Sequence, residues 1–140
     1  MKAARFYDRK DIRIEDIEPQ ELQPGTARVD VAWCGICGTD LHEYLDGPIF
    51  CPSHGNPHPI SGEEPPVTMG HEFCGVISEV ADDIDDLAVG DHVVVEPYII
   101  SEDVNTGPES KTYHLSENMN FIGLGGRGGG LAENVVVKRR

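Results

Sequence analysis

Residues 70–84 read GHEFCGVISEVADDI, a stretch that places a histidine and a glutamate on a glycine turn just before a strand. Gly70 precedes His71 and Glu72, and glycine lets the backbone approach neighbouring groups closely. The residues that follow, Phe73–Val80, are rich in β-branched and apolar side chains and predict a strand. An imidazole and a carboxylate at the start of a strand are the first candidates for a functional site.

A second stretch, CGICGTDLH at residues 34–42, carries the motif C-x-x-C. This motif is typical of thioredoxin-like redox proteins, where it occurs near a βαβ unit, and no such unit is visible in this sequence. It is also typical of half of a structural zinc site, but no second C-x-x-C follows to complete four thiolates. We therefore favour an interpretation in which one cysteine acts with groups from elsewhere in the chain.

Catalytic zinc takes three protein ligands and leaves a fourth position open for substrate or water. Cys37 can supply a thiolate and His71 an imidazole, each on a turn flanked by glycine. Glu72 is either a third ligand or a carboxylate beside the metal that shapes the local field. Thr39 and His42 follow Cys37 closely, and a hydroxyl with an imidazole makes a proton path from a buried substrate to water. These five residues form our predicted site.

The 16 glycines and 10 prolines are spread along the 140 residues and favour short strands over long helices. A short helix is expected at Thr39–Leu45, capped by Thr39 or Asp40, and long loops are expected at residues 46–66 and 101–120. The predicted strands are Lys2–Tyr7, Arg28–Cys34, Phe73–Val80, His92–Glu96 and Ala132–Val137. The sequence thus predicts one mainly β domain, a barrel or sandwich, whose long loops serve function.

The chain is strongly acidic, because 25 Asp and Glu residues against 11 Lys and Arg residues give a net charge of −14. Such a surface repels phosphate backbones and argues against nucleic acid as a partner. An acidic, lysine-poor surface is typical of a salt-loving (halophilic) cytoplasm, where hydrated carboxylates keep a protein in solution. Neither a long apolar run nor a signal-peptide core is visible, so we expect a soluble cytoplasmic protein without membrane contact.

These motifs resemble those of a known family. The pattern Gly70-His71-Glu72-x-x-Gly75-x₅-Ala81-x-x-Ile84 resembles the zinc alcohol dehydrogenase signature of the medium-chain dehydrogenase/reductase superfamily over its whole length. The stretch CGICGTDLHEYLDGP resembles the superfamily's first catalytic-ligand segment, and HPISGEEPPVTMGHEF is similar to its butanediol, polyol and threonine dehydrogenase branch. VGDHVVVEP and GGGLAENVVV fall where the family has later strands. The resemblance implies that residues 1–140 form a GroES-like, partly open β-barrel with one or two short helices.

The resemblance also implies the chemistry of the site. Cys37 and His71 take the places of zinc ligands, and Glu72 that of an exchangeable ligand or of a carboxylate beside the metal. Thr39 takes the place of the hydroxyl that hydrogen-bonds the substrate oxygen, and His42 that of the proton relay. One catalytic zinc ion is implied, with hydride transfer from an alcohol to NAD or NADP. The favoured substrate is a vicinal diol such as butanediol, or acetoin.

The nicotinamide cofactor is expected to bind a Rossmann domain, which this chain does not contain. We therefore expect a catalytic domain of a longer enzyme, inactive alone, with no cofactor-binding residue of its own and a homo-oligomeric whole protein. Many relatives also hold a structural zinc through four close cysteines. The corresponding residues 98–121 contain no cysteine, so we expect no structural zinc and a loosely held, solvated lobe.

Two alternative functions are open. One is a stand-alone GroES-like module with a structural or interaction role and no catalysis, which does not explain why Thr39 and His42 accompany the ligand candidates. The other is a zinc-free reductase of the same superfamily, which the combination of Cys37 with His71 and Glu72 argues against.

Four further residues have both a structural and a functional interpretation. Cys34 is expected at a strand end and Cys74 in the core. Trp33 is expected in the core rather than as a substrate platform. Cys51, with His54 and His58 nearby, could form a second metal site, but a substrate loop is the favoured interpretation.

Residues 123–130 read GLGGRGGG, and the first six fit G-x-G-x-x-G, the fingerprint of a dinucleotide-binding turn. Such a turn needs a strand before it and a helix after it. Here a polar lobe precedes the glycines, and LAENVVV, a strand pattern, follows them. We interpret the run as a turn into a late strand, where positive φ and close packing are required. The acidic residues at 82–86 are interpreted as a solvated turn rather than a cation site.

Overall fold

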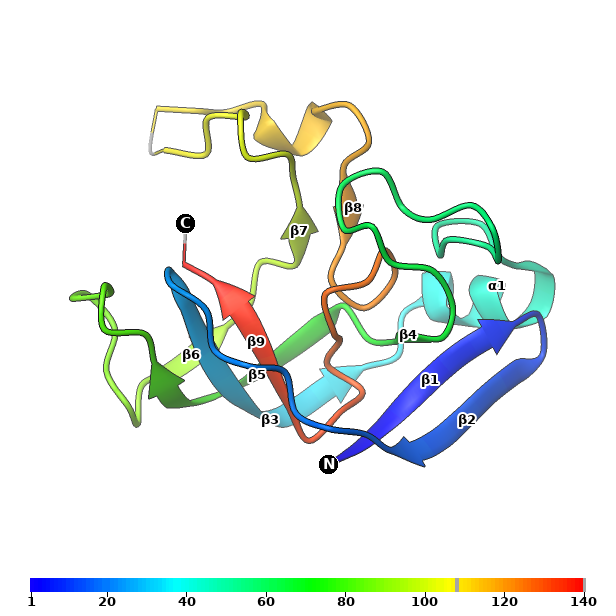
Figure 1. Ribbon diagram of the computed structural model, residues 1–140, viewed down its shortest axis with the longest axis horizontal. Coiled ribbons are helices and arrows are strands. Elements are labelled where there is room, and N and C mark those ends of the chain that lie inside the picture. The colour runs from blue at the N-terminus through cyan, green and yellow to red at the C-terminus, as the bar shows by residue number, and fades with distance from the viewer. Residues whose placement is uncertain (108, 140) are drawn as a thin grey trace.

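The computed structural model describes residues 1–107 and 109–139, whose strands form three antiparallel sheets (Figure 1). The first sheet has the order β2-β1-β4. Its strands are β1 at Lys2–Asp8, β2 at Asp11–Asp16 and β4 at Val67–Thr68. Phe6 on β1 lies opposite Val67 on β4, and both side chains are fully buried. This sheet covers one of the two hydrophobic clusters of the described chain.

The central sheet has the order β6-β5-β3-β9 and holds the larger cluster. Its strands are β3 at Thr26–Gly35, β5 at Glu72–Val80, β6 at His92–Val94 and β9 at Asn134–Lys138. Val29 on β3 lies opposite Ile77 on β5 and Val135 on β9, and all three are buried. Side chains directly opposite one another on paired strands pack together, so the alternating pattern of β3 builds the core. All five predicted strands are confirmed.

A β-bulge in β3 turns Trp33 away from this core. Val31 lies opposite Gly75 and Trp33 opposite Cys74, so β3 advances two residues where β5 advances one. The shift reverses the alternation of side chains between the two faces, and Trp33 is 79% exposed. The prediction that Trp33 is a core residue is therefore wrong. The core position predicted for Cys74 is also wrong, because Cys74 lies beside Trp33 and is only half-buried.

Helix α1, at Gly38–Asp46, begins directly after β3 and lies beside the turn of the β1–β2 hairpin (Figure 1). Its N-cap residue is Cys37, whose backbone N–H donates to Asp40 Oδ2 (2.9 Å). The helix is confirmed, but the prediction of Thr39 or Asp40 as its cap is wrong. Asp40 lies in the first turn, where its carboxylate reaches back to the residue before the helix. Cys34 lies at the end of β3, as predicted.

The polar segment between β7 (Tyr98–Ile99) and β8 (Asn120–Phe121) forms the lobe that the sequence predicts. It contains a short 3-10 helix at Tyr113–Leu115. The Tyr113 hydroxyl donates to Glu96 Oε1 (2.5 Å), and its ring packs edge-on against Tyr98 with 5.8 Å between ring centroids. These contacts attach the lobe to the adjoining strands, so the lobe is more firmly held than its composition predicts.

The three sheets do not close into a barrel. An isolated bridge between Ala3 and Ala132 links β1 to the segment just before β9. Figure 1 shows the curved strands β3, β5 and β9 next to the β1–β2 hairpin, with the lobe above them. The expected mainly β, partly open barrel with long loops and one or two short helices is confirmed. Over the described residues, every helix is too short or too polar to cross a membrane.

Candidate metal centre

Three side chains that the sequence predicts as metal ligands lie together. Cys37 precedes α1, while His71 and Glu72 lie at the start of β5. Strand pairing joins the two segments, because Gly35 at the end of β3 lies opposite Glu72. One ligand atom from each side chain, the Cys37 sulfur, a His71 nitrogen and a Glu72 oxygen, lies within 4.8 Å of the others. Zinc binds such atoms at about 2.0–2.3 Å, so three atoms this close can share one ion.

Asp40 stands behind the cluster and was missed as a site residue by the sequence reasoning. Its Oδ1 lies 3.6 Å from Nδ1 of His71, and both side chains are buried. Neither atom has a hydrogen-bond partner within the described structure. Burial raises the pKa of Asp40, and the N–H of Cys37 and the nearby His71 oppose that rise. An acidic residue three positions after a candidate ligand, in the first turn of a helix, is the sequence signal for it.

The glycine run at residues 123–130 holds the turn that presents His71. Gly70 has φ +95, and its carbonyl accepts a hydrogen bond from the N–H of Gly130 (2.7 Å). A Cβ on Gly123 would lie 2.0 Å from that same carbonyl oxygen, so the backbones approach too closely for any side chain. Phe121, just before the run, stacks on the His71 ring at 5.8 Å. The interpretation of the run as a closely packed turn into a strand is confirmed.

Thr39 and the cluster border one cavity of about 660 Å³. Thr39 Oγ1 lies 3.7 Å from Cys37 Sγ, and His71 and Glu72 form the neighbouring wall. The remaining wall is mostly apolar and is made by Trp33, Gly35, Phe73, Cys74, Val94, Val95, Pro97 and Phe121. A concave, mainly apolar space of this size with a few polar groups is typical of a small-molecule site.

His42 lies apart from this cavity wall. It is on the exposed side of α1, and its Nδ1 lies 3.7 Å from Asp46 Oδ2, one helical turn away. The side chains of both residues are 67% exposed. The structure therefore brings Cys37, Thr39 and the His71–Glu72 pair together and leaves His42 at the solvent side of the same helix.

The loop after α1 is pinned from beneath by a buried glutamate. Glu43 is fully buried, and its carboxylate accepts the backbone N–H groups of Ile49 (2.9 Å) and Phe50 (2.5 Å). Cys51 lies next to it, and burial, followed by the Glu43 charge, raises the pKa of this thiol far above its ordinary value. A protonated, buried thiol is a poor metal ligand. Burial also raises the pKa of Cys34 to about 11.

The loop also binds the glycine run. The Ser61 hydroxyl donates to the carbonyl of Gly125 (2.5 Å), and the N–H of Arg127 donates to Glu63 Oε1 (2.6 Å). His58 is buried, and its Nδ1 accepts the N–H groups of residues 60 and 61. Burial lowers the pKa of His58. These roles agree with the favoured substrate-loop interpretation, since Cys37, His71 and Glu72 form the only metal-binding group found among the described residues.

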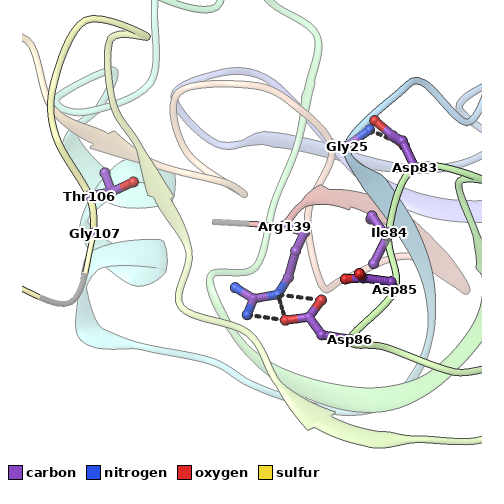
Figure 2. Close-up of a pocket in the computed structure, with 8 residues that line it drawn as sticks. All are labelled: Gly25, Asp83, Ile84, Asp85, Asp86, Thr106, Gly107 and Arg139. Carbon is purple, nitrogen blue, oxygen red and sulfur yellow. Dashed lines mark hydrogen bonds and ion pairs between the residues drawn. The ribbon is translucent and has the colours of Figure 1, made fainter.

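A second hollow, of about 540 Å³, lies away from the cluster beside the acidic turn (Figure 2). There the Arg139 guanidinium pairs with the Asp86 carboxylate, with Nη2 2.5 Å from Oδ2. Asp83 accepts the N–H of Gly25 at 2.9 Å. The acidic residues thus tie the end of β9 and the start of β3 together, and an arginine neutralises one of them.

Comparisons with known proteins agree with this arrangement. Residues 23–140 match the model of the alcohol dehydrogenase GroES-like domain. The chain is 66% identical over its whole length to (R,R)-butanediol dehydrogenase of Neisseria gonorrhoeae, of which it covers 39%, and 52% identical over 98% of its length to that of Bacillus subtilis, of which it covers 38%. It thus spans about two fifths of these relatives.

Solved structures give the same result. A crystal structure of 2R,3R-butanediol dehydrogenase from Bacillus subtilis has a TM-score of 0.89 at 51% identity, covering 98% of this chain and 38% of that one. A putative zinc-binding dehydrogenase from Sinorhizobium meliloti 1021, bound to NADP, has a TM-score of 0.76 at 34% identity, covering 99% and 36%. The chain belongs to the alcohol dehydrogenase GroES-like domain family.

Proposed function

We propose that this chain is the zinc-holding catalytic domain of an NAD(P)-dependent alcohol dehydrogenase that oxidises a vicinal diol such as butane-2,3-diol, or reduces acetoin. The observation that carries the proposal is the convergence of Cys37, His71 and Glu72 on one point at the wall of a mainly apolar cavity. The butanediol dehydrogenases that the chain resembles at 52–66% identity support the substrate class.

The donor set fits zinc. A thiolate, an imidazole and a carboxylate are all ligands that zinc accepts, and three protein ligands leave one position for a substrate oxygen. His71 turns Nδ1 toward Asp40, which leaves Nε2 for the metal, and a carboxylate behind a ligating histidine fixes the ring and raises its basicity. When bound, zinc supplies a Lewis acid that lowers the pKa of the alcohol hydroxyl.

The protein's own groups orient the alcohol and carry its proton. Thr39 lies beside Cys37 on the cavity wall, where its hydroxyl accepts a proton from the substrate hydroxyl while donating its own. His42, three positions on and exposed to solvent, is the proposed outer end of this path, since a relay must finish in water. The apolar wall excludes water from the reacting carbon, which gives up a hydride to the nicotinamide ring.

Other features of the proposal concern the whole protein. The relatives are about two and a half times as long as this chain, and we propose that NAD or NADP binds a Rossmann domain outside residues 1–140. One zinc ion per chain and a homo-oligomeric assembly are proposed with it. Four free cysteines support a reducing, cytoplasmic compartment. The net charge of −14 supports function at high salt.

The test is turnover by the whole, zinc-loaded protein, with NAD and NADP each offered with butane-2,3-diol. We expect oxidation of the diol with one of the two coenzymes, and its loss in Cys37→Ser and His71→Ala. Cys74→Ser is the matched control, because this thiol borders the same cavity but lies outside the cluster, and we expect it to retain activity. Equal activity in Cys37→Ser and Cys74→Ser would contradict the proposal.

A further inference from the structure

The cavity beside the cluster has an apolar wall that is open in this structure. Trp33 on β3, Cys74 on β5 and Val94 on β6 lie side by side, because Cys74 is the pairing partner of both others. Paired residues project to the same face of a sheet. Trp33 is 79% exposed and Val94 84% exposed, yet both border the cavity that Thr39, His71 and Glu72 complete.

The β-bulge in β3 is what builds this wall. Ala27 and Val29 point into the core, and an unbroken strand would carry Trp33 to the same side. The extra residue between Val31 and Trp33 instead places the indole opposite Cys74. Bulges are common beside active sites, where they redirect one side chain.

We propose that Trp33 determines the substrate range by contacting the alkyl part of the diol, while the hydroxyl groups face Thr39 and the cluster. This inference rests on the proposed function, because it concerns the same cavity. An indole offers a large, rigid apolar surface, and a full-size tryptophan at this wall leaves room for short alkyl groups and excludes longer ones. Val94 extends the same apolar surface by one strand.

The position of Trp33 favours a substrate contact over a purely structural role. The indole contributes little to the core, being mostly exposed. It borders the same space as Thr39, the proposed partner of the substrate hydroxyl, and this space of about 660 Å³ lies within the range of small-molecule sites. A specific side chain that a bulge has moved from the core to this wall therefore has a function in the cavity.

The experiment compares butane-2,3-diol with hexane-3,4-diol, which has one more methylene group at each end. In the whole, zinc-loaded protein, we measure kcat/KM for both diols in the wild type, Trp33→Ala and Trp33→Phe. Ile14→Ala is the matched control, since Ile14 is 70% exposed on β2, outside this cavity wall. We expect the preference for the shorter diol to fall about tenfold or more in Trp33→Ala, to fall less in Trp33→Phe, and to be unchanged in Ile14→Ala.

A binding measurement accompanies the kinetics. Trp33 is the single tryptophan of this sequence, so its fluorescence, after subtraction of the Trp33→Phe signal, should change when butane-2,3-diol binds. If Trp33→Ala and Trp33→Phe both turn over the two diols with the wild-type preference, the inference is overturned and the proposed function stands. A raised KM for NAD(P) with an unchanged diol preference would place the indole on the cofactor and also overturn it. A wild type that oxidises neither diol would overturn both the proposed function and this inference.

Discussion

Asp40 and His71 face each other inside the protein, with Oδ1 of the carboxylate 3.6 Å from Nδ1 of the imidazole. Both side chains are at least nine-tenths buried, and neither atom has a hydrogen-bond partner within the described structure. Burying polar groups without good partners costs free energy. A carboxylate and an imidazole that together hold a metal ion would offset that cost, so the pair is better explained as part of a metal centre than as part of the core.

Replacing Asp40 by Asn should weaken zinc binding. The neutral amide keeps the size of the side chain but removes the charge that orients His71 and raises its basicity, and such changes typically lower metal affinity about 10–100-fold. Competition for zinc with a chelating indicator measures the affinity. The control is Asp82→Asn, an exposed carboxylate in the acidic turn, which should leave it unchanged. Equal zinc affinities in the two variants would show that Asp40 has no role at the metal.

Adding a methyl group to Gly123 should destabilise the fold near His71. The new Cβ would lie 2.0 Å from the Gly70 carbonyl oxygen, at a φ of +91. Forcing these backbones apart should cost about 1–3 kcal/mol in the free energy of unfolding, measured by urea denaturation. In Gly38→Ala a Cβ would have open space, and this variant should be at least as stable as the wild type. A Gly123→Ala variant of unchanged stability would refute the packing role of the glycine run.

Removing the Thr39 hydroxyl should slow the chemical step. Thr39→Ala should lower kcat by about 10²-fold or more, as expected when a positioned proton-transfer group is lost, and Thr39→Ser should retain most of the activity. Steady-state kinetics with butane-2,3-diol separates kcat from KM. Equal losses of kcat in the Ser and Ala variants would mean that the methyl group or the packing matters rather than the hydroxyl.

Alkaline pH should destabilise the protein, in part through Cys51. Burial raises the pKa of this thiol above its ordinary value of 9.0, so the folded state keeps a proton that the unfolded chain loses above that pH. The folded state then binds more protons than the unfolded state, and the stability contributed by the neutral thiol falls as pH rises. Cys34, with its pKa raised to about 11, acts in the same direction between pH 9 and 11.

Urea midpoints at pH 8 and pH 10 test this. The wild type should lose stability between the two values, and Cys51→Ala should lose less, whatever its stability at pH 8. Val89→Ala, a truncation of a 67% exposed side chain, should keep the wild-type decline. A Cys51→Ala variant with the full wild-type decline would show that this thiol is not a source of the pH dependence.

The sequence predicts the parts of this molecule that follow local rules. The strands of the central sheet carry alternating apolar residues such as Ala27 and Val29, and those strands are where they were expected. β2 at Asp11–Asp16 was not predicted, because it is a mostly exposed edge strand whose alternation has no buried face to report. The position of Trp33 could not be predicted, because a bulge depends on how two strands pair rather than on either sequence alone.

The candidate site divides in the same way. Cys37, His71 and Glu72 could be predicted, because metal-binding residue types on glycine turns are visible in a sequence. That Asp40 faces His71 depends on how α1 packs against the start of β5, which no local pattern reports. The close approach of Gly123 to Gly70 is likewise a contact between distant segments, and the glycines signal only that some close approach exists.

Cobalt substitution tests most directly the claim that Cys37, His71 and Glu72 hold a metal ion. Cobalt(II) bound to a thiolate shows a sulfur-to-metal charge-transfer absorption band, which identifies cysteine ligation without any assay of activity. We predict this band in the whole, cobalt-loaded wild type and in Cys74→Ser, its loss in Cys37→Ser, and weaker cobalt binding in His71→Ala. A band that survives in Cys37→Ser, or that disappears in Cys74→Ser, would contradict the account.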